Sequence, residues 1–316
     1  MHKPEYANGD PRNLAFIGHW DGCSPYKHSN HSSGAIEVTV ANMRKSERLK
    51  VEEVYVLGFV PFNQVPKDNP HLLDPFLQPL VDEIKEGFIN GITVDYVYNG
   101  EDIPKGNRIR CLLLCFTTDY PGICEVGKFL NGGRSPCRRC KVKGERIPTA
   151  CHNQMYYAEN RFHARYPWQE VQVSQEVDIM SEIQGEQRKS VRKKLSSQYG
   201  FTGISVLHQL HALYGFDILK DLVYDIHHLL PLNLIKNQID RFVEEGLLNP
   251  KDVERKLRTF PWTSDLKEGR VPTGFDKGVV IGRHKNTESF ASLCRSVCLK
   301  VCCPLRNMKF GQPLPV

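Results

Sequence analysis

The order of strand-like and helix-like patterns is the feature that most restricts how this chain can fold. Runs with strand character come first, at residues 14–18, 36–40 and 54–60. A helical apolar pattern over 72–89, a buried-strand pattern over 110–117 and a short helical pattern over 122–130 follow. The series strand, strand, strand, helix, strand, helix predicts an α/β fold with a mixed sheet, because a strand that returns after a helical crossover runs parallel to its neighbour.

Acidic residues follow two of the expected strands. Asp21 comes after the first run, within a His-Trp-Asp-Gly sequence that we expect to form a turn, and Asp119 follows the buried strand. Three antiparallel strands and a parallel fourth form the ribonuclease-H-like topology, in which these two carboxylates lie side by side. Paired carboxylates can hold Mg²⁺ or Mn²⁺ for phosphodiester chemistry. The residues alone also permit a plainer interpretation, in which both are ordinary turn residues.

Beyond residue 130 the character of the chain changes. Residues 131–200 are polar and basic, the stretches 198–216 and 218–242 predict helices, and 243–280 predicts a charged helical stretch interrupted by prolines. We therefore expect a ribonuclease-H-like core in 1–130, a mainly helical insertion in 131–280, and the remnant of a final core helix with an irregular Cys-rich tail in 281–316.

Cysteine usage points to the compartment and to a metal. The chain has 11 cysteines, an odd number, and its first residues form no export signal, which predicts a reducing intracellular location. Cys137 and Cys140 form a CxxC motif that can give Zn²⁺ two thiolate ligands. The other two ligands could come from a Cys-His pair at 151–152 or a His-His pair at 227–228. Unliganded thiols and a redox pair are the alternatives.

A second group of candidate metal ligands lies in the stretch predicted as a helix over 218–242. Asp225 and His228 are three residues apart, so a helix would place both on one face. They could ligate a metal ion together, or Asp225 could orient the His228 ring. A polar patch on a buried helix is the alternative.

Charge and composition limit the partners. Lysine and arginine total 42 against 36 acidic residues, which gives a formal net charge of +6. No apolar run approaches the roughly 20 residues that span a bilayer, so we expect no membrane partner. Two basic clusters could follow a phosphate backbone, or they could be solvated surface. The candidate nucleic-acid contacts are Arg134, Arg138, Arg139, Lys141, Lys143, Arg192, Lys193 and Lys194.

Several sequence blocks together resemble one known family. They are Phe16–Gly22, Gly34–Val38, Leu73–Leu80, Asp119–Gly122, Gly127–Asn131, the CxxC, Tyr166–Trp168, Gly200–Gly203, Tyr214–Asp217 and the Asp-x-x-His motif. Spread over about residues 14–290, these blocks resemble the transposases of CACTA-type (En/Spm-like) DNA transposons, in particular the animal branch.

The resemblance implies a DDE-type transposase with a ribonuclease-H-like core. In that family water attacks the phosphodiester at the transposon end, and the freed 3′-hydroxyl then attacks target DNA. The implied catalytic acids, which hold Mg²⁺ or Mn²⁺, are Asp21, Asp119 and Glu288. Glu288 ends the sequence His-Lys-Asn-Thr-Glu, where the family usually has Trp-Lys-Ala-x-Glu. The implied zinc motif falls on Cys137 and Cys140, and Asp225 and His228 form the Asp-x-x-His motif.

The same resemblance implies the partners, which are the DNA of transposon ends and target, and further copies of the chain, within the nucleus. The chain begins close to the first core strand and ends in a Cys-rich stretch over 294–316, so we expect a truncated copy. A catalytically inactive relic that still binds DNA or protein is therefore the main alternative. A structural zinc protein without a nucleic-acid role is the other.

Overall fold

The computed structural model describes a central domain and parts of a second unit. The described residues are 13–23, 33–61, 73–93, 97–98, 101–102, 108–140, 142–146, 155–156, 173–226, 234 and 236–259. The chain divides into two compact units, Met1–Tyr224 and Asp225–Val316. Within the described part of the chain, no helix has both the length and the hydrophobicity that are needed to cross a membrane.

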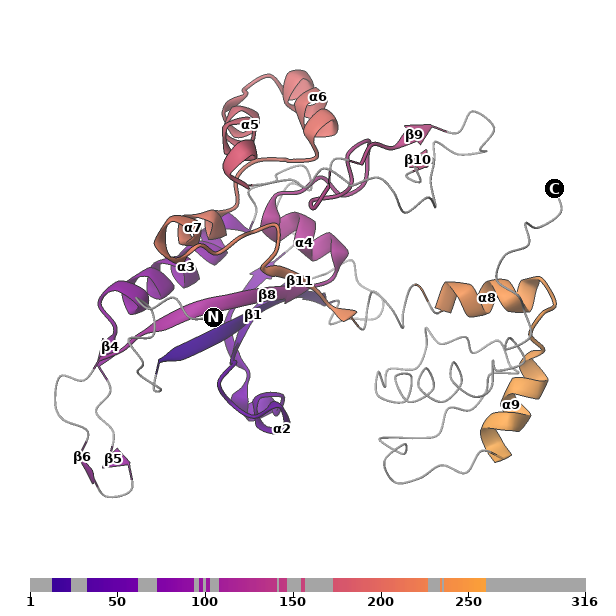
Figure 1. The fold of residues 1–316 in the computed structure, drawn as a ribbon, viewed down its shortest axis with the longest axis horizontal. Helices are drawn as coiled ribbons and strands as arrows, with labels where there is room; N and C mark the ends of the chain where they lie inside the picture. Colours follow the sequence, from indigo (N-terminus) through magenta and orange to yellow (C-terminus); the bar gives the residue numbers. More distant parts are fainter. Residues whose placement is uncertain are drawn as a thin grey trace. The chain divides into compact units, whose positions relative to one another are not determined.

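A five-stranded mixed sheet forms the centre of the first unit (Figure 1). Its strands are β1 (Leu14–Cys23), β2 (Ser33–Val40), β3 (Tyr55–Pro61), β8 (Cys111–Thr118) and β11 (Leu222–Tyr224). The spatial order is β11-β8-β1-β2-β3. β2 runs antiparallel to both β1 and β3, whereas β8 runs parallel to both β1 and β11. The mixed α/β class that the element order predicted is therefore confirmed.

The first strand is longer than its sequence pattern predicted. The turn expected at Asp21 is wrong, because β1 continues through this residue and pairs Asp21 with Ala35 and Gly22 with Gly34 of β2. Gly34 makes this pairing sterically feasible, since a Cβ at that position would overlap the indole ring of Trp20. Asp21 is thus held by strand pairing on β1 and is exposed.

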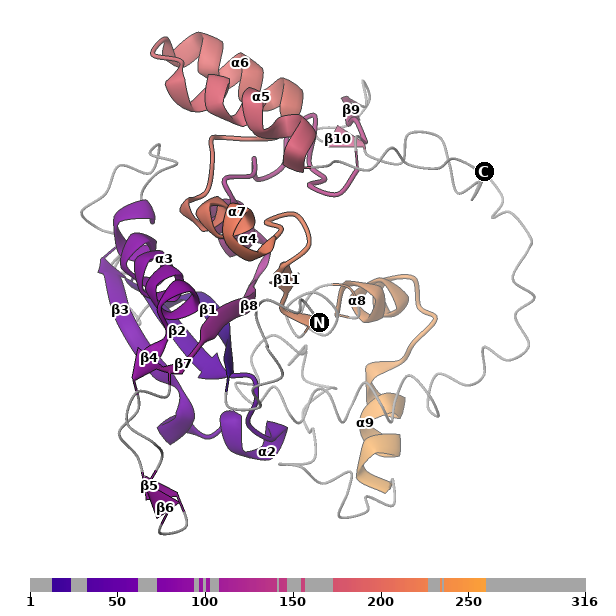
Figure 2. The same ribbon diagram turned by 60° about the vertical axis from the view of Figure 1, so that its left-hand side comes forward.

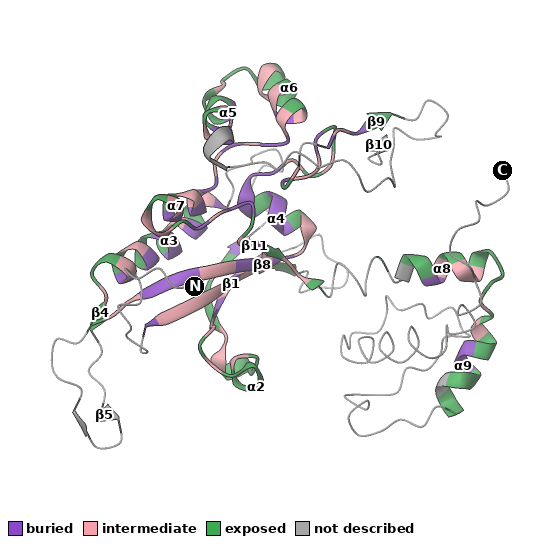
Figure 3. Cartoon of the chain, viewed as in Figure 1, coloured by how far each residue is buried: buried purple, intermediate pink, exposed green. Residues whose placement is uncertain are grey.

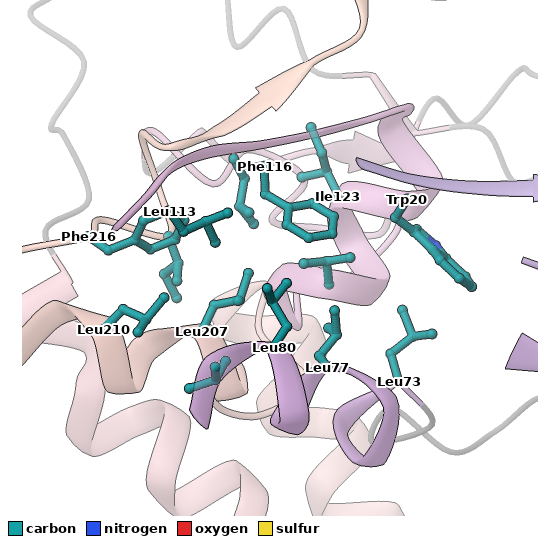
Figure 4. Packing of buried hydrophobic residues seen from close by; sticks show 14 of the residues in the cluster. Trp20, Leu73, Leu77, Leu80, Leu113, Phe116, Ile123, Leu207, Leu210 and Phe216 are labelled. Carbon is teal, nitrogen blue, oxygen red and sulfur yellow. The ribbon is translucent and has the colours of Figure 1, made fainter. Parts of the chain in front are cut away.

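Helix α3 (Asp74–Ile89) forms where the apolar spacing predicted a helix (Figure 2). Pro75 occupies its first turn, where a missing N–H costs nothing, and the backbone N–H of Asn90 closes its last turn on Glu86. Its inner face buries Leu77, Leu80, Val81 and Ile84. These side chains pack with Leu113 and Phe116 of β8 and with Leu207 and Leu210, as Figure 4 shows for part of the cluster.

Shorter elements complete the first unit. They are α2 (Lys45–Arg48), the 3₁₀ turns Val51–Glu53 and Val206–His208, α4 (Tyr120–Gly127), α5 (Val173–Gly185), α6 (Lys189–Tyr199), α7 (Gln209–Tyr214), and the two-residue strands β4 (Ile92–Thr93), β5 (Val97–Tyr98), β6 (Glu101–Asp102), β7 (Arg108–Ile109), β9 (Glu145–Arg146) and β10 (Met155–Tyr156). β4 pairs with β7, β5 with β6, and β9 with β10. In the second unit the structure describes α8 (Lys236–Glu244) and α9 (Pro250–Thr259), whose residues are mostly exposed (Figure 3).

The two long helices predicted over 198–216 and 218–242 are wrong in this form. α6 ends at Tyr199 because Gly200 takes a left-handed conformation, with φ of 86°. α7 ends in the same way at Tyr214, because Gly215 has φ of 78°. Leu222–Tyr224 then pairs with β8 as an edge strand of the central sheet. The stretch 131–280, expected to be a helical insertion, therefore also supplies a strand to the sheet.

The glycine beside Trp20 gives a direct test of this packing. Gly34→Ala should lower the free energy of unfolding by about 1–3 kcal/mol, because the new methyl group overlaps a ring that is only 3% exposed. Gly58→Ala on β3 is the matched control, since no atom lies within 4 Å of its Cβ position, and its effect should stay within about 0.5 kcal/mol. Urea unfolding measures both, and equal effects would contradict the packing.

Candidate functional site

The two expected acids lie at the carboxyl ends of neighbouring parallel strands. The β1–β8 register pairs Gly18 with Phe116 and His19 with Thr117. Asp21 and Asp119 each follow this last pair by two residues. Parallel strands present their carboxyl ends at the same edge of a sheet, so both residues belong to one edge.

Asp119 begins α4 as its N-cap. Its Oδ1 accepts a hydrogen bond from the backbone N–H of Gly122 at 2.8 Å, which satisfies one of the free N–H groups of the first turn. A Cβ at Gly122 would overlap Thr118 Oγ1 and lie 3.0 Å from both Asp119 Oδ1 and Trp20 Cδ1. The Asp119 carboxylate and the residue directly before Asp21 therefore border the same small space.

Potential metal ligands do not gather into a cluster of three in the part of the chain that the structure describes. No group of three or more His, Cys, Asp or Glu side chains within those residues is arranged to hold a metal ion. Glu288, expected as the third acid, and His228 lie outside the described residues. Asp225 does not lie within a long helix as predicted, because it directly follows β11.

Glu125 of α4 and Lys128, which directly follows this helix, each connect it to another element, and neither was a candidate site residue from the sequence. The Trp20 indole N–H donates to Glu125 Oε2 at 3.1 Å, which joins β1 to α4. The pKa of Glu125 is raised above its ordinary value. Removal of its carboxylate from water is the largest cause and the charge of Asp119 adds to it, while the hydrogen bond from Trp20 acts in the opposite direction. Glu125 gave no sequence signal, because a glutamate on a short helix is usually solvated, and this residue is indeed exposed although its carboxylate meets the buried Trp20.

Lys128 follows α4 and is almost fully buried, with 1% of its surface exposed. Its Nζ lies 2.6 Å from Asp74 Oδ1 at the start of α3. Burial lowers the pKa of Lys128, while the charge of Asp74 opposes this shift. A buried ammonium requires such a partner, so this ion pair fixes the end of α4 against the start of α3. In the sequence, Lys128 was marked by its place in the block Gly-Lys-Phe-Leu-Asn, which is one of the blocks that resemble the transposase family.

A polar row crosses the sheet next to the acids. The His19 ring contacts Thr39 Oγ1 of β2 at 3.2 Å through Nε2 and Thr117 Oγ1 of β8 through Nδ1. Because side chains on a strand alternate between faces, His19 and Asp21 lie on the same face of β1. These contacts therefore link β2, β1 and β8, and His19 and Thr117 each lie two residues before one of the two acids.

The CxxC motif lies on a loop that is fixed to the sheet by the arginine inside it. Arg138 is 5% exposed, and its guanidinium donates to the carbonyls of Ile218, at 3.4 Å, and of Leu222. The guanidinium carbon also lies 4.8 Å from the centre of the Tyr224 ring. The expectation that Arg138 contacts DNA is not supported, because the side chain is buried against the protein's own carbonyl groups.

Cys137 and Cys140 are half-buried, and neither forms a disulfide. The backbone N–H of Arg139 donates to Cys137 Sγ at 3.4 Å.

The remaining basic residues divide by exposure. Arg134, Arg139, Lys193 and Lys194 are exposed and Arg192 is half-buried, whereas Lys141 lies outside the described residues. Lys143 is half-buried, and its Nζ donates to Ser135 Oγ and to the carbonyl of Gln198, both at 2.7 Å. This second contact joins the loop of the first basic cluster to the end of α6, which carries the second cluster.

Comparison with known proteins identifies one family. The family model described as "Transposase family tnp2" matches residues 1–199. No curated protein matches the chain. No solved structure matches it either.

The two adjacent arginines of the CxxC loop allow a matched test of the buried contact. Arg138→Ala should lower the free energy of unfolding by about 2–3 kcal/mol, because two carbonyl groups lose a charged donor. Arg139→Ala removes an exposed side chain whose guanidinium makes a long, solvent-exposed hydrogen bond to the Lys220 carbonyl at 3.3 Å, and should change it by no more than about 1 kcal/mol. Chemical denaturation measures both values, and a smaller loss for Arg138→Ala than for Arg139→Ala would refute the assignment.

Proposed function

The chain belongs to the tnp2 transposase family, and on this basis we propose that it cleaves and joins DNA at the acidic edge of its central sheet. The proposed reaction is phosphodiester hydrolysis at a transposon end, followed by transesterification into target DNA, as in DDE-type transposases. The proposal rests mainly on the parallel β1–β8 register, which supports a site built on Asp21 and Asp119. Both residues lie within the matched part of the chain.

A ribonuclease-H-like core is part of the proposal. Its support is the strand arrangement, in which three antiparallel strands are followed by a fourth and a fifth that run parallel to the first. The CACTA type also belongs to the proposal, and it rests on the sequence blocks.

Asp21, Asp119 and Glu288 are the residues that would hold the divalent metal. The two described members are carboxylates, and hard oxygen donors are the ligands that Mg²⁺ and Mn²⁺ prefer. When bound, such ions supply Lewis-acid stabilisation of the phosphodiester oxygens and lower the pKa of bound water. Asp119 is oriented for this role by the N–H of Gly122, and Asp21 by its strand pairing with Ala35.

The DNA partner is expected along the exposed basic residues Arg134, Arg139, Lys193 and Lys194. Their charges could neutralise backbone phosphates, which would make binding weaken steeply as salt increases. Nuclear location and assembly with further copies of the chain follow from action on paired transposon ends, and they remain part of the same proposal.

Zinc at the CxxC motif is proposed as a structural feature of the loop. The supporting observations are the two half-buried cysteines of the loop's Cys-x-x-Cys sequence and the N–H that Arg139 directs at Cys137. The expected further ligands at 151–152 or 227–228 lie outside the described residues. A metal there would stabilise the loop that Arg138 fixes to β11.

The reaction is tested by the nicking of supercoiled plasmid DNA with Mg²⁺ or Mn²⁺. Asp119→Asn and Asp21→Asn should each reduce nicking by at least about 100-fold, because each replaces a charged metal ligand with a neutral amide. Asp82→Asn on the exposed face of α3 removes the same charge elsewhere and should nick like the wild type.

The outcome also separates the proposal from its alternative. DNA binding by the wild type without nicking in either metal would select the inactive relic, with DNA binding retained by the basic residues. Nicking that persists in Asp119→Asn, or that needs no metal, would refute the proposed site.

Zinc content gives an independent test of the loop. The purified chain should contain one Zn²⁺ per molecule, and Cys137→Ser should lose it and lower the midpoint of thermal unfolding, because a two-thiolate anchor is broken. Cys115→Ser, which changes a half-buried thiol outside the motif, should keep the metal. Atomic emission measures the metal, and full zinc content in Cys137→Ser would exclude this site.

A further inference from the structure

We propose that Glu125 is a positioning residue for the two acids, and that it acts through its hydrogen bond to Trp20. The inference rests on the proposed function, because it concerns the geometry of the site that Asp21 and Asp119 would form. Glu125 itself is not assigned as a metal ligand.

The first step is that the two residues of this hydrogen bond, Trp20 and Glu125, lie on the elements that carry the two acids. Trp20 is the residue directly before Asp21 on β1, and Glu125 lies on α4, the helix that Asp119 begins. The 3.1 Å bond therefore connects the strand that carries one acid to the helix that is capped by the other. These partners are separated by 105 residues, so the contact forms only when the sheet and α4 are assembled.

The second step is that the indole ring has little freedom of its own. Trp20 is 3% exposed, and its ring fills the space that a Cβ at Gly34 of β2 would need. The ring also borders Gly122 in the first turn of α4, where Asp119 accepts its hydrogen bond. A ring that is packed on both sides transmits a constraint at its N–H to the backbone of β1.

The third step is that the surroundings of Glu125 contain a buried ion pair. The Glu125 carboxylate interacts with the ammonium of Lys128, which forms the buried ion pair with Asp74. The side-chain contact that places the Glu125 acceptor oxygen is its 3.1 Å hydrogen bond from the Trp20 indole. Groups that hydrogen-bond to metal ligands typically change metal affinity by about 10- to 100-fold when they are removed, which sets the scale for a support that acts through the neighbouring residue.

Alternative roles for Glu125 predict different patterns in two variants. Glu125→Gln keeps an oxygen that can accept from the indole but removes the charge, whereas Glu125→Ala removes both. If the hydrogen bond positions the acids, the alanine variant should bind Mn²⁺ about 10- to 100-fold more weakly and the glutamine variant should bind it almost as tightly as the wild type. If only the charge mattered, both variants would be weakened alike.

The experiment measures Mn²⁺ affinity of the full chain by electron paramagnetic resonance, together with Mn²⁺-dependent nicking and the thermal unfolding midpoint. Glu83→Ala, an exposed glutamate on α3, is the matched control and should retain wild-type affinity. Trp20→Phe removes the indole N–H donor but leaves the charges of Glu125 and Lys128 in place. It should weaken Mn²⁺ binding, as Glu125→Ala does. The Glu125 variants decide the question if Trp20→Phe does not fold.

Several results would overturn the inference. A lower thermal midpoint with unchanged Mn²⁺ affinity in Glu125→Ala would show a structural role only, and equal weakening in Glu125→Gln and Glu125→Ala would show a role for charge. Both results leave the proposed function standing, because the wild type still binds and nicks. If the wild type bound no Mn²⁺, the proposed function would fail and the positioning role would fail with it.

Discussion

The parallel pairing of β1 with β8 is the constraint on which the arrangement of the site depends. The two strands are far apart in the sequence, and their register places His19 against Thr117. With that register fixed, Asp21 and Asp119 must follow at one edge of the sheet, whatever the surrounding loops do. A slip of one residue would turn every side chain of a strand to the other face, so the buried Trp20 and Phe116 protect the register as well as the core.

Helix α4 is the element through which the rest of the first unit supports that edge. It begins at the Asp119 cap, contacts β1 through Glu125, and is followed by Lys128, whose buried ammonium pairs with Asp74 of α3. Buried charges are costly when a partner is removed, so this short helix has little freedom to shift along the sheet. Its rigidity explains how eight residues can orient the Asp119 carboxylate.

The CxxC loop shows that two arginines adjacent in the sequence can have different environments in the fold. In the sequence, Arg138 stands among arginines and lysines and was expected to contact DNA with them. In the structure it is directed inward to the carbonyls of Ile218 and Leu222, while Arg139 beside it is exposed. The consequence is a link between the thiol pair and the edge strand β11, so that metal at the loop would stabilise the sheet as well.

The sequence by itself determined the α/β class, helix α3 and the strand cores, because periodicity and capping are local properties that each segment carries alone. The candidate acids were also readable, since each stands at the end of a strand pattern. The tertiary structure alone decided that β1 continues through Asp21, that Leu222–Tyr224 joins the sheet, and that Glu125 meets Trp20. The physical reason is that each depends on a partner distant in sequence: a strand needs its neighbour's hydrogen bonds, and a buried polar group needs a counterpart that only the assembled fold provides.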